Sequence, residues 1–119
     1  SVRDGKFEFK VLGVERGATS KDGGFGTTDT AKGEYFTVKL QVTNIGDDAR
    51  TLFASNQKLI INGNKYEATS HITDDGWKED INPGLGSTTT ATFDIPPGAV
   101  PTAIECHDSA FSGGALLAL

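Results

Sequence analysis

The chain has 119 residues, and its 16 acidic side chains outnumber 11 basic ones, so that its formal net charge is −5 at pH 7. A chain of this length fits one domain, residues 1–119, with an ordinary hydrophobic core. The negative balance excludes nucleic acids as expected partners, because a polyanion is repelled where no basic stripe is present.

Cys106 is the single cysteine, so no disulfide can form within the chain. That fits a cytosolic protein, and it equally fits an exported domain. No apolar run approaches the roughly 18 residues that span a bilayer. The opening residues SVRDGK contain neither an initiator Met nor an apolar signal region. We interpret the chain as a mature or trimmed domain, attached to a membrane only through a tether outside these residues.

Two segments with strict apolar–polar alternation predict half-buried strands. In KFEFKVLGV (residues 6–14), Phe7, Phe9 and Val11 share one face, and charged side chains occupy the other. EYFTVKLQVTN (residues 34–44) repeats the pattern, with these side chains pointing inward: Phe36, Val38, Leu40 and Val42.

The segment between these strands, residues 17–33, is rich in Gly and Thr and has no periodicity. It predicts a long surface loop. Loops of this length are either functional or disordered, and the sequence leaves both alternatives open.

Turn and strand signals follow in quick succession after the second strand. NIGDDA predicts a turn, and TLFAS (residues 51–55) predicts a short strand. QKLIINGNKYEA predicts a hairpin around a type I′ turn at Asn62-Gly63. The expected cross-strand pairs are Ile61 with Asn64, Leu59 with Tyr66 and Lys58 with Glu67.

The last third of the chain predicts a second loop, residues 71–86, followed by three strands. STTTATFDI places Thr89, Ala91, Phe93 and Ile95 on an inner face. PPGAVP predicts a turn, and TAIEC and ALLAL predict two strands around the loop HDSAFSGG. Together these elements predict an all-β fold, an immunoglobulin-like antiparallel β-sandwich of about 7–8 strands.

Several strings also carry a resemblance: DGKFEFKVLGV, VTNIGDDARTLFASNQKLIINGNKYEA and INPGLGSTTTATFDIPPGAVPTAIECHDSAFSGG. Together they resemble a bacterial domain family of unknown function carried by Gram-positive and actinobacterial lipoproteins. The fold of that family is similar to that of the mycobacterial secreted immunoprotective antigen. The resemblance implies an immunoglobulin-like sandwich, export, tethering at the cell surface, and no catalytic residues or cofactor.

The string CHDS (residues 106–109) places four reactive side-chain types side by side. Successive strand residues point to opposite faces, so Cys106 is expected to point inward and His107 outward. A Cys–His pair is therefore disfavoured, and we expect an inert buried thiol, a solvated histidine and a polar turn. A small hydrolase is the weakest alternative function.

An acidic cluster lies in the second loop: Asp74, Asp75, Glu79 and Asp80. Clustered loop carboxylates are the usual source of calcium ligands, although the spacing does not match a twelve-residue calcium loop. A calcium-dependent adhesion or stability module is therefore an alternative function, and solvated loop charge is the simpler interpretation.

Two large aromatic side chains, Phe25 and Trp77, lie within polar loops, where binding hot spots are found. Each could instead fold back over an open end of the sandwich. We expect a non-enzymatic, extracytoplasmic domain that presents its loops to a protein or cell-envelope partner. The sequence does not predict the oligomeric state.

Overall fold

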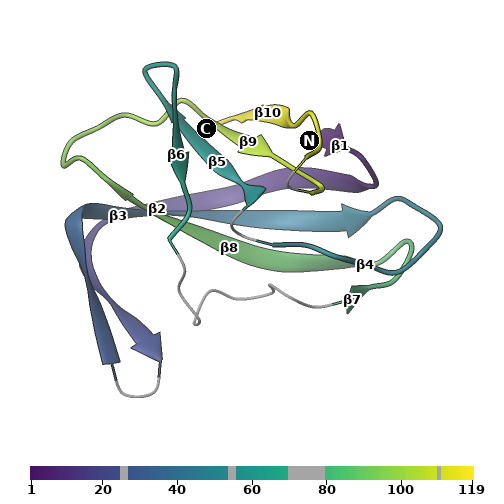
Figure 1. Ribbon diagram of the computed structural model, residues 1–119, viewed down its shortest axis with the longest axis horizontal. Helices are drawn as coiled ribbons and strands as arrows, with labels where there is room; N and C mark the ends of the chain where they lie inside the picture. The colour runs from purple at the N-terminus through teal and green to yellow at the C-terminus, as the bar shows by residue number, and fades with distance from the viewer. Residues whose placement is uncertain (25–26, 54–55, 70–79, 110) are drawn as a thin grey trace.

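The computed structural model describes residues 1–24, 27–53, 56–69, 80–109 and 111–119, with the backbone alone for residues 21–24 and 27. Within these residues the chain forms ten strands and no α-helix. Two four-stranded antiparallel sheets pack as a sandwich, and a separate pair of short strands lies at one end (Figure 1). The prediction of an all-β, immunoglobulin-like antiparallel sandwich is confirmed.

The first sheet has the strand order β1-β2-β3-β8 and contains the two longest strands. Its strands are β1 (Val2–Asp4), β2 (Phe7–Gly24), β3 (Thr27–Asn44) and β8 (Gly86–Ile95). The predicted alternation is confirmed, because these inward side chains are all buried: Phe7, Phe9, Phe36, Val38, Leu40, Val42, Thr89, Ala91, Phe93 and Ile95.

The second sheet has the order β10-β9-β5-β6. Its strands are β10 (Ala115–Ala118), β9 (Ala103–Cys106), β5 (Lys58–Ile61) and β6 (Asn64–Glu67). The predicted hairpin is confirmed in detail, since Leu59 pairs with Tyr66 and Lys58 with Glu67. Asn62 and Gly63 both have positive φ, 50° and 78°, as a type I′ turn requires.

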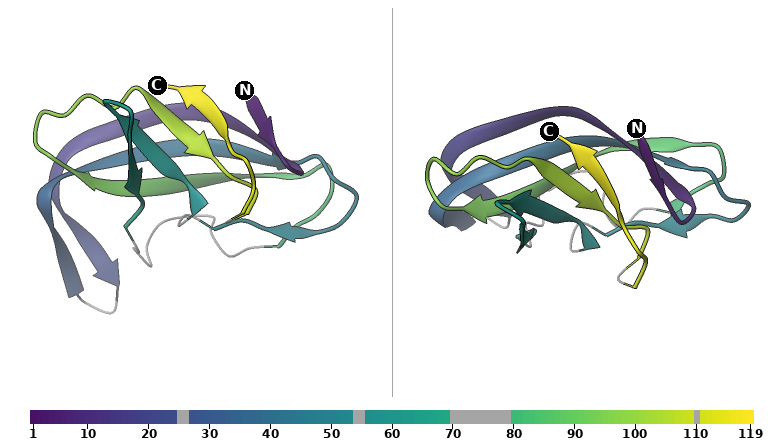
Figure 2. Two further views of the ribbon diagram at one scale, coloured as in Figure 1. Left: turned by 45° about the horizontal axis from the view of Figure 1, so that its top comes forward. Right: turned by 90° about the horizontal axis from the view of Figure 1, so that it is seen from above.

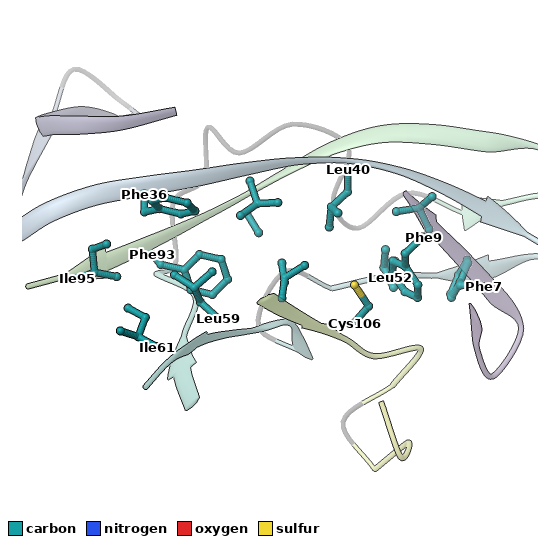
Figure 3. Packing of buried hydrophobic residues seen from close by; sticks show 14 of the residues in the cluster. Phe7, Phe9, Phe36, Leu40, Leu52, Leu59, Ile61, Phe93, Ile95 and Cys106 are labelled. Atoms are coloured by element: carbon teal, nitrogen blue, oxygen red, sulfur yellow. The ribbon is translucent and has the colours of Figure 1, made fainter. Parts of the chain in front are cut away.

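The core lies between the two sheets, where Leu59 and Ile61 of β5 face Phe36 of β3 and Phe93 of β8 (Figure 3). Burying side chains of this size stabilises the fold by roughly 1.5 to 3 kcal/mol each. Cys106 completes the core from β9 and is fully buried, which confirms its predicted inward position.

The predicted loop at residues 17–33 is wrong for most of its length. β2 continues to Gly24 and β3 starts at Thr27, so the segment forms a two-stranded ribbon that we call the arm, with Ser20 opposite Thr30. The arm bends away from the sheet at the far left of Figure 1. No described side chain of the arm packs in the core, so an alternation of apolar and polar residues is not required there.

In the described part of the strand predicted over residues 51–55, the prediction is wrong beyond Thr51. Only β4 (Arg50–Thr51) is extended and paired, with β7 (Asp80–Ile81) as its partner. Leu52 packs in the core instead. The strand number exceeds the predicted 7–8 because β1, β4 and β7 are only two or three residues long and too short to show a period.

Candidate functional site

A network of polar side chains ties the N-terminal hairpin to the β9–β10 connection. We call it the polar clasp, and its members are Asp4, Arg50, Gln57, Glu105, His107, Asp108 and Ser112. The carboxylate of Asp4 accepts three hydrogen bonds, from the backbone N–H of Asp108 (2.7 Å), the hydroxyl of Ser112 (2.5 Å) and the N–H of Gly114 (2.9 Å). β1 is therefore held by one side chain to a segment more than 100 positions away.

Asp108 makes the reciprocal connection. Its buried carboxylate accepts the backbone N–H of Lys6 (2.5 Å) and Nη2 of Arg50 (2.8 Å). Gly5 lies directly against this carboxylate with φ = 57°, a conformation that a residue with a Cβ rarely adopts. The β1–β2 turn therefore depends on glycine for both its backbone conformation and its space.

His107 is buried, with 9% of its surface exposed, so the expectation of a solvated histidine is wrong. Its Nε2 lies 2.6 Å from Oε1 of Glu105, and its Nδ1 lies 3.2 Å from the hydroxyl of Ser112. The side-chain amide of Gln57 bonds both the N–H (2.7 Å) and the C=O (2.9 Å) of His107. Strand alternation alone places His107 on the outward face, but tertiary contacts bury its side chain there.

Cys106, the last residue of β9, points into the core, whereas His107 lies with Glu105 on the opposite side, as predicted. Burial, with further contributions from Asp4 and Glu105, raises the pKa of the Cys106 thiol to about 12. A thiol with this pKa is almost fully protonated at neutral pH, and its sulfur is enclosed in the core. Cys106 therefore contributes packing, as predicted, and supplies no thiolate.

The structure brings together a Ser–His–Glu arrangement that the sequence reasoning missed: Ser112, His107 and Glu105. The i, i+2 spacing of Glu105 and His107 was the available signal. The serine hydroxyl donates to the carboxylate of Asp4 at 2.5 Å and also lies 3.0 Å from the C=O of Ser109. Because the charged carboxylate of Asp4 is a stronger and nearer acceptor for its proton than Nδ1 of His107 at 3.2 Å, the hydroxyl is held as a structural donor.

The pKa values of two clasp carboxyls are lowered overall. Burial alone would raise the pKa of Asp4, but the hydrogen bonds from Ser112 and from the amides of Asp108 and Gly114 outweigh it. Burial likewise opposes the effect of His107 and Lys65 on Glu105, whose pKa is also lowered. The folded protein therefore stabilises the ionised form of both carboxyls, and ionisation of these groups in turn favours folding.

We expect the folded state to weaken in acid through these groups. Their ordinary pKa values are 3.8 and 4.5, so their contribution is fully present above that range and is lost as the pH falls through the lower folded values. Urea unfolding measured from pH 6 to pH 2.5 should show this decline, and Asp4→Asn and Glu105→Gln should each flatten it. Equal slopes in the parent and both variants would contradict the assignment.

A surface depression of about 640 Å³ lies beside the clasp. Arg50 and Asp108 contribute to its lining, as do two exposed aromatic rings, Phe53 (43% exposed) and Phe111 (100% exposed). Sequence reasoning did not select either phenylalanine. Phe111 lies in the predicted loop HDSAFSGG, the kind of setting that selected the other loop aromatics, whereas Phe53 lies in the predicted strand TLFAS and carried no such signal.

Most residues selected from the sequence lie outside the described part of the chain: Phe25, Asp74, Asp75, Trp77 and Glu79. Asp80 is described, at the start of β7, where its Oδ1 accepts the hydroxyl of Thr51 at 2.6 Å. In the described ranges no group of three or more His, Cys, Asp or Glu side chains is placed to hold a metal ion. The calcium and aromatic-contact hypotheses stay predictions.

Comparison with protein families identifies the chain over nearly its whole length. Residues 1–116 match the family described as Domain of unknown function (DUF4352). The chain belongs to this family. Neither the curated proteins nor the solved structures gave a match. In the described residues no helix is long and apolar enough to cross a membrane.

Proposed function

We propose that this domain is a non-enzymatic binding module of an extracytoplasmic protein, in which the sandwich is a rigid frame and the arm engages another protein or a cell-envelope component. The proposed compartment and the tether, a lipid or a membrane segment outside these residues, rest on the resemblance to envelope lipoproteins. The single observation that supports a binding role is the arm itself.

The arm is long for a connection between two neighbouring strands. Register pairs continue from Ala18–Tyr35 out to Gly24–Thr27, well past the end of β8, which pairs with β3 only as far as Glu34. The described arm therefore extends beyond the point where β8 stops pairing with β3. A two-stranded ribbon of this kind contributes little to a core and is marginally stable in water by itself. A partner surface is the physical setting in which such a ribbon gains buried contacts.

The base of the arm is anchored to the frame, which would present the ribbon in a fixed direction. The backbone amides of Lys32 and Gly33 donate to the carboxylate of Asp94 at 2.7 and 3.0 Å. Arg16 forms an ion pair with Glu34 and lies over the ring of Phe36, with Cζ 5.6 Å from the ring centroid. A pre-organised base reduces the entropy lost when a partner binds.

Trimming the arm tests the proposal. Residues 21–29 are replaced by Asn-Gly, because the flanking pair Ser20–Thr30 then matches the pair Ile61–Asn64 that flanks the turn in the β5–β6 hairpin. We expect unchanged thermal unfolding, within about 0.5 kcal/mol, since none of the described core residues belongs to the replaced segment. When each domain is immobilised and exposed to envelope extract, we expect the intact domain to retain a component that the trimmed domain does not retain.

A matched control separates the arm from other exposed surfaces. Phe111→Ala removes a fully exposed ring next to the clasp and should leave retention unchanged. Equal retention by the intact and trimmed domains would contradict the proposed role of the arm. The compartment has its own test: a signal segment with a lipid-acceptor cysteine encoded upstream of Ser1 supports export, and a cytosolic start contradicts it.

A further inference from the structure

The outer edge of β2 has a stretch to which no described strand is hydrogen-bonded. β1 pairs with β2 only across Phe7–Phe9, and β3 occupies the opposite edge. Among the described strands, none pairs with the outer edge from residue 10 onward. In both views of Figure 2, β2 runs on past the N-terminal end of β1 along the margin of the sheet. Unpaired N–H and C=O groups at such an edge are available to a second strand.

Two large aliphatic side chains lie on this stretch. Leu12 is 46% exposed and Val14 is 48% exposed, although both belong to a strand whose earlier apolar residues are packed in the core. Exposed aliphatic side chains on an unpaired strand edge favour pairing with another chain.

Because of a β-bulge at Leu12, the side chains of residues 10–15 point to the two faces of the sheet in an order that is symmetric about Gly13. Leu12 has no opposite residue on β3, because the register shifts between Val11 and Gly13. With Leu12 set aside, the side chains alternate between the outer and the core-facing side of the sheet, beginning on the outer side, in the order Lys10, Val11, Gly13, Val14 and Glu15.

We propose that two copies of this chain pair antiparallel through this edge, about a two-fold axis at Gly13. Opposed residues in an antiparallel pair share one face of the sheet, and this register satisfies that rule. Gly13 then lies opposite Gly13 of the second copy. Val11 meets Val14 on the core-facing side. Lys10 meets Glu15 on the outer side, and the symmetry makes each of these pairs twice.

The charges on the edge are complementary in this register. Neither Lys10 nor Glu15 has an ion-pair partner within the described residues, whereas the adjacent Arg16 is already paired with Glu34. A side chain at Gly13 would meet no atom within 4 Å, so the outer face of the sheet is open at the centre of this edge. The ladder would end at Arg16, where a second register shift turns β2 into the arm.

Sedimentation velocity of residues 1–119 across a wide concentration range tests the pairing. We expect a concentration-dependent monomer–dimer equilibrium. K10E and E15K each place like charges opposite one another twice, and each should raise the dissociation constant about tenfold. The double variant K10E/E15K restores opposite charges and should return the constant to near the parent value. Circular dichroism confirms that each variant keeps the strand content of the parent.

A second pair of variants controls for non-specific apolar contact. V14K should abolish the dimer, whereas V100K, at a position that is 70% exposed in the β8–β9 connection, should leave it intact. A parent chain that is monomeric at every concentration overturns the proposal. A dimer that V100K weakens as much as V14K does, or that the charge exchange fails to restore, also overturns it. The result does not depend on whether the arm binds a partner.

Discussion

Replacing Asp4 with alanine should lower the free energy of unfolding by about 3 kcal/mol, because it leaves several donors of the clasp without an acceptor. The donors that lose their acceptor are the N–H groups of Asp108 and Gly114 and the hydroxyl of Ser112. The free hydroxyl alone could turn to the C=O of Ser109, which is already 3.0 Å away. The two backbone N–H groups cannot rotate to another acceptor in this way, so most of the lost stability comes from them. Urea unfolding followed by circular dichroism measures the change.

Two comparison variants make the Asp4 result specific. Asp4→Asn keeps the shape of the side chain but only one carbonyl oxygen, so its loss should fall between those of the parent and Asp4→Ala. Asp47→Ala removes an exposed carboxylate in the β3–β4 turn and should change stability by less than about 0.5 kcal/mol. If Asp4→Ala proves as mild as Asp47→Ala, the clasp does not hold the N-terminal hairpin.

Replacing Gly33 with alanine should cost about 2 to 3 kcal/mol, because the new methyl group has no room. Its Cβ would lie directly against the carbonyl oxygen of Ile95, 2.9 Å from the carbonyl carbon and 3.2 Å from Cδ of Pro97. The nearest atoms belong to backbone, so β3 and β8 must move apart at the end of their ladder. That movement would also strain the hydrogen bond from the Gly33 N–H to Asp94.

The matched control for this substitution is Gly113→Ala. Gly113 is exposed, and an added Cβ there meets no atom within 4 Å. We expect a change below about 0.5 kcal/mol, since only the entropy of the unfolded chain is altered. Thermal unfolding of both variants decides the point. Similar midpoints for Gly33→Ala and Gly113→Ala would show that β3 and β8 can separate freely at this position.

The proposed arm contact and the proposed dimer use different parts of β2. The dimer edge covers residues 10–15, and the arm begins beyond Arg16. A dimer of this geometry would carry two arms, and binding through two linked sites strengthens attachment to a surface that displays several copies of a partner. The trimmed domain should therefore still dimerise, and V14K should still bind through its single arm.

Local sequence patterns were sufficient to predict the main strands of the sandwich and the β5–β6 hairpin. Alternation along residues 34–44 marked the buried face of β3, and Asn62-Gly63 specified the turn and its register. The sequence also placed Cys106 in the core. Each of these predictions depends on neighbours a few positions apart, where a period of two or the preference of a turn residue acts directly.

The arm and the clasp depend on contacts between distant segments and could not be predicted from local patterns. No described side chain of the arm belongs to the core, so its sequence did not need to alternate, and its strands are defined by pairing with each other. The clasp joins Asp4 and Arg50 to Asp108, positions that no local pattern relates. His107 was expected in solvent and is buried because Glu105, Ser112 and Gly114 lie against its ring. Contacts between distant segments form only when the chain has folded, which is why alternation could assign the face of a side chain but not its partners.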